Sequence, residues 1–268
     1  MQQKEEKMAY PEAELKALAQ KVFEELDSTR KITLYTGEYP DLTMDEAYRV
    51  QFEVAEKRRA ADHHQVGMKI GLSNPVVQQQ FGVNEPVFGH MFDIVGLDSH
   101  DIDTGRYIKP IVEPEITFLL KKDLKGPGVT RCDVLAATEG VFASIELPNN
   151  RYEEKSVTAQ DMLVLDTMSQ GLVLGDMLCD PHNIDLRTQG VVLEINGQMV
   201  ATGAGAAVLD HPANSLAWLA NRLVDYGTYL KAGYLVPAGS FTAAGFPKKG
   251  DVVKATFTQL GSVEARFV

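Results

Sequence analysis

The first third of the chain carries the apolar rhythm of amphipathic helices. Over residues 11–27, apolar side chains recur at intervals of three and four, the spacing that lines one face of a helix. Thr43 and Glu46 match a capping box, which predicts the start of a second helix running to about Arg59. A short helix is predicted over residues 74–81, where Pro75 suits the first turn.

Beyond residue 88 the pattern changes to short apolar runs separated by Gly, Asp, Asn and Pro, which indicates strands joined by turns. Asn196-Gly197 predicts a hairpin. Two helices interrupt the runs, a clear one after Pro212 and a short one over residues 133–140. Strands are predicted over residues 66–72, 111–120, 141–147, 163–166, 190–195, 252–258 and 263–268.

These elements predict an α+β fold with a small helical N-terminal part on a larger β-rich part. We place the helical part at residues 1–85 and a β-rich catalytic core at residues 86–268, with one integrated domain as the alternative. No internal repeat, low-complexity tract or linker divides the chain.

Composition narrows the classes of protein. The 268 residues are 44% hydrophobic with a net charge of −11, which disfavours nucleic acid and anionic lipid as partners. The two cysteines form no CxxC pair, so a disulfide framework is not expected. The charged N-terminus does not resemble a signal peptide, and no apolar run is long enough to cross a membrane. A cytoplasmic protein is therefore expected.

Three glutamates are the main candidates for chemistry. Glu113 and Glu115 lie two residues apart at the start of the apolar run VEPEITFLL, so on a strand they share one face. Glu146 ends another apolar run. Three carboxylates from two strands form a hard, oxygen-rich site that suits Mg²⁺ or Mn²⁺. The alternative is a strand edge with one carboxylate in solvent and one in a salt bridge.

Two cations are weaker candidates. Lys69 stands alone inside the apolar stretch VGMKIGLS, where a buried amine needs an anion or acts as an acid or base. Its head could equally reach solvent from a strand. Arg151 follows the turn after Glu146 and could clamp a carboxylate, although such arginines are more often simply on the surface.

The glycine-rich segment GAGAAV at residues 203–208 is only a partial match to a dinucleotide-binding fingerprint. Val208 occupies the position of the third glycine, and no ribose-binding acid follows at the required spacing. We therefore reject NAD binding and expect these glycines to allow a close backbone approach.

Several segments together resemble the fumarylacetoacetate hydrolase superfamily, and within it the branch of 2-oxopent-4-enoate hydratases and 4-oxalocrotonate decarboxylases. The resemblance covers nearly the whole chain. The segments that carry it are YPDLTMDEAY, VGMKIGLS, GVNEPVFG, VEPEI, IELPNNRYE, DLRTQGVV, GAGAAVLDHPANS and LGSVEARFV.

The resemblance implies a mixed β-roll and a Mg²⁺ or Mn²⁺ site. The metal ligands of the family correspond to Glu113, Glu115 and Glu146, and its catalytic lysine to Lys69. The substrate-binding residues that we expect are Arg151, Val87, Asp166 and Ser169. Relatives often have D-N-A-S where this chain has residues 166–169 as D-T-M-S, which leaves residues 167 and 168 without an assigned role.

The resemblance further implies decarboxylation of 2-oxohex-3-enedioate in aromatic meta-cleavage pathways. The hydratases carry an acid where this chain has Val87, which favours the decarboxylase over the alternative, hydration of 2-hydroxypenta-2,4-dienoate. A binding scaffold without chemistry is a third class, disfavoured because all four charged residues are present. The implied partners are a small 2-oxo dicarboxylate, further copies of the chain in a homo-oligomer, and a pathway hydratase.

Overall fold

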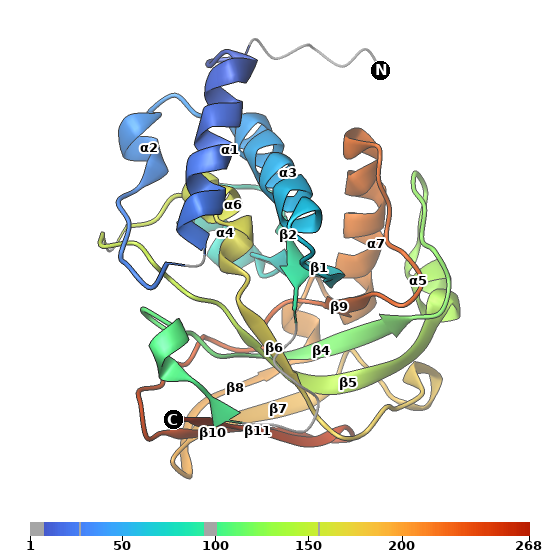
Figure 1. Ribbon diagram of the computed structural model, residues 1–268. Helices are drawn as coiled ribbons and strands as arrows, with labels where there is room; N and C mark the ends of the chain where they lie inside the picture. Colours follow the sequence, from blue (N-terminus) through green and yellow to red (C-terminus); the bar gives the residue numbers. More distant parts are fainter. Residues whose placement is uncertain (1–7, 27, 94–100, 155) are drawn as a thin grey trace.

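The computed structural model describes residues 8–26, 28–93, 101–154 and 156–268. Two β-sheets are joined to a helical N-terminal part (Figure 1). The helices are α1 (Glu12–Leu26), α2 (Tyr35–Glu38), α3 (Met44–Ala60), α4 (Pro75–Gln80), α5 (Arg131–Ala137), α6 (Ala159–Val164) and α7 (Pro212–Arg222). Short 3₁₀ turns are η1 (Thr104–Arg106), η2 (Asp166–Met168), η3 (Pro181–Asn183), η4 (Gly205–Ala207) and η5 (Leu223–Tyr226).

A six-stranded sheet has the order β2-β1-β9-β4-β5-β6, and a five-stranded sheet has the order β3-β11-β10-β7-β8. Both sheets are mixed, because β1 pairs with β9 and β3 with β11 in parallel. The strands are β1 (Gln65–Gly71), β2 (Val87–Phe92), β3 (Asp101–Ile102), β4 (Glu113–Leu120), β5 (Thr138–Leu147), β6 (Gly171–Leu174), β7 (Gly190–Ile195), β8 (Gln198–Ala204), β9 (Leu235–Pro237), β10 (Val252–Phe257) and β11 (Gly261–Phe267).

The layers follow from which faces are apolar. Figure 1 shows α1 and α3 on one side of the six-stranded sheet, with the five-stranded sheet on the other side. Strands β10 and β11 pack on β5. One continuous apolar core runs from the N-terminal helices through both sheets. Among the described residues, no helix is both long and apolar enough to span a bilayer.

The predicted α+β architecture is confirmed, as are most of its helices. The inner stripe of α1 is buried, and α3 begins at the capping box of Thr43 and Glu46. The hairpin at Asn196-Gly197 joins β7 to β8, with positive φ at both residues. The segment around residues 203–205 brings backbone close to backbone, since a Cβ on Gly203 would lie 1.9 Å from the carbonyl oxygen of Phe241.

One predicted strand is wrong. Residues 163–166 lie at the end of α6 and the start of η2 instead. Thr158 caps α6, and the Asp161 carboxylate completes a capping box, which commits the segment to a helix. A run of three apolar residues fits a buried helical turn as well as a strand, so the pattern of residues 163–165 does not decide between the two.

Strands β2, β6 and β9 escaped prediction because every residue of β2 and β6 is buried and β9 has only three residues. Because β2 and β6 have no solvent-facing side, they lack the alternation of polar and apolar residues that identifies a half-buried strand. The division predicted at residues 85 and 86 falls between β1 and β2, which are paired in one sheet.

Candidate active site

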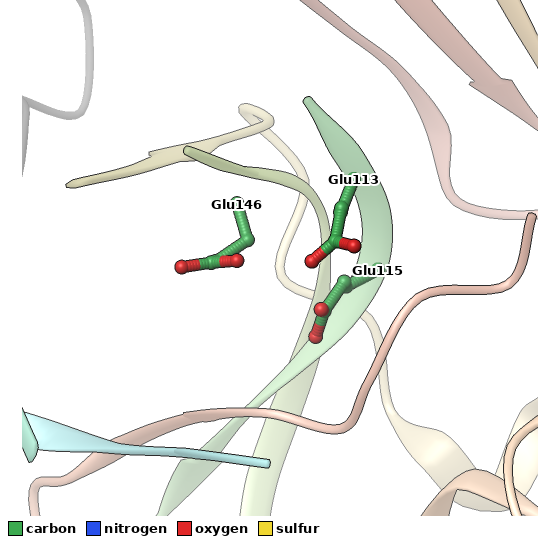
Figure 2. A group of neighbouring side chains, drawn as sticks. All are labelled: Glu113, Glu115 and Glu146. Carbon is green, nitrogen blue, oxygen red and sulfur yellow. The ribbon is translucent and has the colours of Figure 1, made fainter. Parts of the chain in front are cut away.

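The register of β4 and β5 assembles the three glutamates. Glu113 lies directly opposite Glu146 across the two strands, and Glu115 lies two residues further along the same face of β4. One carboxylate oxygen from each residue lies within 4.8 Å of the others. Figure 2 shows the side chain from β5 and the two from β4 bordering one common space.

Two of the three glutamates are almost fully withdrawn from water. Glu115 and Glu146 are 1% and 0% exposed, and Glu113 is half-buried. Glu115 Oε2 accepts a hydrogen bond of 2.7 Å from the backbone N–H of Gly239. Lys69 Nζ lies 2.8 Å from Glu146 Oε1 as an ion-pair contact, and neither Glu146 oxygen receives a directed hydrogen bond from the residues described.

The protonation equilibria reflect an excess of negative charge. Burial raises the pKa of Glu146 to about 8; the charge of Glu113 adds to this, and Lys69 opposes it. Burial likewise raises the pKa of Glu115 well above its usual range, with further increases from Glu146 and Glu113. Burial acts to lower the pKa of Lys69, but the charges of the three carboxylates, led by Glu146, outweigh it, and the net shift is upward.

Each of these shifts favours additional positive charge in the cluster. Three carboxylates face one ammonium group, so the buried charges do not cancel. The donor atoms are all hard oxygens, which a divalent cation such as Mg²⁺ or Mn²⁺ prefers. A hard divalent cation therefore balances the charge of the three carboxylates better than protonation and Lys69 alone would.

Lys69 and Val87 lie on the same face of the β1–β2 hairpin. Lys69 pairs with Gly89 and Gly71 pairs with Val87, and residues two apart on a strand share a face. Val87 is fully buried, and its Cγ2 would lie 3.2 Å from a Cβ on Gly71. The apolar side chain of Val87 thus lies next to the buried amine of Lys69 along the same face of the strand pair.

Residues 166–169 lie against this hairpin, but the Asp166 carboxylate is directed at His90. Asp166 Oδ1 accepts from the His90 backbone N–H at 2.7 Å and lies 3.1 Å from His90 Nδ1. The structure places Ser169, which is half-buried, between η2 and β6, the strand that pairs with the end of β5 where Glu146 lies.

Arg151 is held by the N-terminal part. Its guanidinium donates to the carbonyl oxygens of Leu26 at 3.1 Å and Ser28 at 2.6 Å, and also to that of Glu25. These carbonyls belong to the C-terminal end of α1 and the residues after it, where carbonyl groups lack helical partners. The contacts tie α1 to the loop after β5, and this observed role differs from the substrate clamp that the sequence suggested.

Three groups that contact the candidate residues or their neighbours were absent from the candidate set. They are the Gly239 N–H bonded to Glu115, His90 bonded to Asp166, and Thr167, whose hydroxyl donates to the carbonyl of Phe88, next to Val87. A backbone donor leaves no signal in the sequence. His90 gave none either, since no residue at metal-ligand spacing accompanies it. The D-T-M-S segment was a signal for Thr167, because the resemblance implies D-N-A-S at residues 166–169.

The family model described as "Fumarylacetoacetate (FAA) hydrolase C-terminal" matches residues 73–268. A 4-oxalocrotonate decarboxylase from Pseudomonas sp. (strain CF600) is 38% identical over 245 residues, covering 91% of this chain and 92% of the relative. A 2-hydroxypent-2,4-dienoate hydratase from Pseudomonas putida is 40% identical over 213 residues, covering 78% and 96%.

A solved structure extends the likeness to the fold. The 4-oxalocrotonate decarboxylase from Pseudomonas putida G7, complexed with magnesium and adipate, superposes with a TM-score of 0.93 at 34% identity. The match covers 98% of this chain and 100% of that chain. The chain belongs to the fumarylacetoacetate hydrolase C-terminal family.

Proposed function

We propose that the chain is a metal-dependent decarboxylase that converts 2-oxohex-3-enedioate (4-oxalocrotonate) to 2-hydroxypenta-2,4-dienoate and carbon dioxide, in aromatic meta-cleavage catabolism. The observation that carries the proposal is the buried group of three carboxylates facing Lys69, with the apolar Val87 on the face of Lys69. The similar decarboxylases support the choice of reaction.

Glu113, Glu115 and Glu146 would hold the cation, because their oxygens converge and their charges are unbalanced. When bound, a divalent cation supplies Lewis acidity toward the 2-oxo group of the substrate. The Gly239 N–H keeps Glu115 oriented, since it occupies Oε2 at 2.7 Å. The magnesium in the similar decarboxylase structure supports Mg²⁺, with Mn²⁺ as the other hard cation that the donors suit.

Lys69 would hold the proton that the reaction consumes. As the bond to the far carboxylate breaks, its electrons move through the alkene to the C2 oxygen, and that oxygen takes up one proton to give the 2-hydroxydiene. The amine of Lys69 is buried and lies 2.8 Å from Glu146 Oε1, beside the carboxylates that would hold the cation. This position suits a proton donor and a counter-charge for a substrate carboxylate.

Val87 favours decarboxylation over hydration. An apolar side chain cannot activate water, and an apolar wall favours a carboxylate leaving as neutral carbon dioxide, because burying a charge is costly. The similar hydratase, at 40% identity, makes hydration of 2-hydroxypenta-2,4-dienoate the second candidate.

The reaction type is tested by offering both substrates to the purified enzyme with Mg²⁺. We expect carbon dioxide release from 2-oxohex-3-enedioate and little loss of diene absorbance from 2-hydroxypenta-2,4-dienoate. Rapid diene loss without carbon dioxide release would instead identify a hydratase.

The metal site is tested with Glu115→Gln. The amide keeps the shape of the side chain and an acceptor for Gly239 N–H but removes one charge. Calorimetry should show Mg²⁺ affinity reduced by at least ~10–100-fold, the loss typical even for residues that only support a ligand. Glu139→Gln, an exposed change on the same strand as Glu146, is the control and should leave the affinity unaltered. Equal affinity in both variants would remove Glu115 from the metal site.

Replacing Lys69 should affect turnover without removing the metal. General acid–base assistance contributes ~10²–10⁴-fold, so Lys69→Ala should lose about that factor in kcat while calorimetry still detects Mg²⁺ binding. Lys69→Arg should recover only part of the rate, because arginine retains the charge but does not readily give up a proton. A wild-type rate in Lys69→Ala would make the lysine purely structural.

Assembly is the finer part of the proposal. We infer a homo-oligomer that also associates with the hydratase consuming its product. Apolar side chains on β8, the outer strand of the five-stranded sheet, support a contact surface: Met199 is 67% and Val200 49% exposed. Sedimentation should give an oligomer at micromolar concentration and a heavier species when such a hydratase is added. A monomer with no added mass would contradict both expectations.

A further inference from the structure

Strand β2 forms one end of the six-stranded sheet, and side chains from η2 cover its outer edge. Asp166 Oδ1 accepts from the His90 N–H at 2.7 Å, and Thr167 Oγ1 donates to the Phe88 carbonyl at 2.7 Å. These two backbone groups lie two residues apart on the strand. The turn thus replaces a neighbouring strand for the part of β2 that lies opposite Lys69.

The same turn also lies on the face of the hairpin that carries Lys69. A Cβ on Gly89, the register partner of Lys69, would be 2.5 Å from the Asp166 carbonyl oxygen. A Cβ on Gly71 would be 2.9 Å from the methyl carbon of Thr167. Both glycines therefore leave room for the turn at the two positions that flank Lys69.

On its other side the turn reaches the carboxylate half of the site. The Met168 carbonyl accepts from the Asn149 N–H at 3.0 Å, and Asn149 lies three residues after Glu146. The turn consequently bridges the strand pair that holds Lys69 and the loop that leaves the Glu146 strand.

The backbone of the turn does not adopt this shape unaided. Asp166, Thr167 and Met168 have φ of 52°, 54° and 58°, a left-handed region that L-residues rarely occupy and β-branched threonine least of all. Such a conformation persists only where its surroundings over-determine it. The buried contact of 3.1 Å between Asp166 Oδ1 and His90 Nδ1 adds a second anchor at its first residue.

We propose that Asp166, anchored on His90, is a positioning residue for Lys69: it holds the left-handed turn on β2, and β2 sets where the amine stands opposite Glu146. The other neighbour of β1 is β9, which pairs with it only at Gly67 and Leu235, two residues before Lys69. At Lys69 itself, β2 is therefore the strand that fixes the position of β1. This inference rests on the proton-donating role proposed for Lys69. It also gives Asp166 a place behind the site instead of in contact with substrate.

The test is a double-mutant cycle on kcat for carbon dioxide release, with Asp166→Ala, Lys69→Ala and both changes together. If Asp166 acts through Lys69, removing it lowers kcat in the wild-type background and has little further effect once the lysine is gone. The coupling expected for interacting residues is roughly 2- to 150-fold. Asp166→Asn should restore much of the rate, because its amide oxygen still accepts from the His90 N–H.

Asp161→Ala is the matched control. Asp161 is equally buried and accepts from Thr36 N–H and from the Thr36 and Thr158 hydroxyls, but not from β2. Its loss should lower stability but change kcat by the same factor with or without Lys69. Equal factors for Asp166→Ala in the two backgrounds would overturn the proposal. If Asp166→Ala fails to fold, Thr167→Val, which removes the hydroxyl bond to Phe88, enters the same cycle with the same expectation.

A second measurement separates this inference from the proposed reaction. In protein labelled with ¹³C-lysine, the ε-methylene signal of Lys69 is the one missing from Lys69→Ala. It should shift in Asp166→Ala, or in Thr167→Val where that variant replaces it, and stay in place in Asp161→Ala. A shift in a protein that releases no carbon dioxide would leave the positioning role standing and reject the reaction. An unmoved signal would reject the positioning role whatever the enzyme does.

Discussion

The unbalanced charge buried between β4, β5 and β1 is the constraint on which the rest of the site depends. Three carboxylates face one ammonium group in a region that water hardly reaches. Leaving one buried charge without its partner typically costs ~3–5 kcal/mol. The protein can meet this cost by taking up protons, which the raised pKa values of Glu115 and Glu146 reflect, or by taking up a cation. A divalent cation held by all three carboxylates would balance this charge, which is the physical argument for the proposed metal site.

The fold supplies this arrangement with little local machinery. Direct pairing of Glu113 with Glu146 depends only on the register of two antiparallel strands, and a slip of one residue would turn Glu113 and Glu115 to the other face. The hydroxyl of Ser144 donates to the Glu115 carbonyl at 2.9 Å and lies 2.8 Å from the Thr117 hydroxyl, which supports that register beside the acids. A stable pair of buried strands is thus what keeps the repelling carboxylates together.

What the sequence could predict follows from how far each signal reaches. The E-x-E spacing and the apolar run after it are local, so the convergence of two carboxylates on one face was predictable, as were α1, α3 and the β7–β8 hairpin. Lys69 and Glu146 were suggested by their positions within apolar runs of the sequence, and only the resemblance assigned them to the same site. Arg151 shows the limit of such local signals. Its partners, the carbonyls of Leu26 and Ser28, lie more than 120 residues away in the sequence, and no sequence pattern predicts these contacts.

The segment after α6 shows a different limit. Apolar residues 163–165 have the composition of a strand but lie at the end of α6. Residues 166–168, which form η2 after them, take a left-handed path that ordinary propensities disfavour. Residues held in that region cost of order 1–3 kcal/mol each, so three in succession require compensation from outside the segment. The compensation comes from the edge of β2 and from His90, tens of residues away in sequence. The left-handed conformation of η2 therefore conflicts with local propensity and is maintained by distant contacts on the face that carries Lys69. Conflicts of this kind are expected at positions where function requires the conformation.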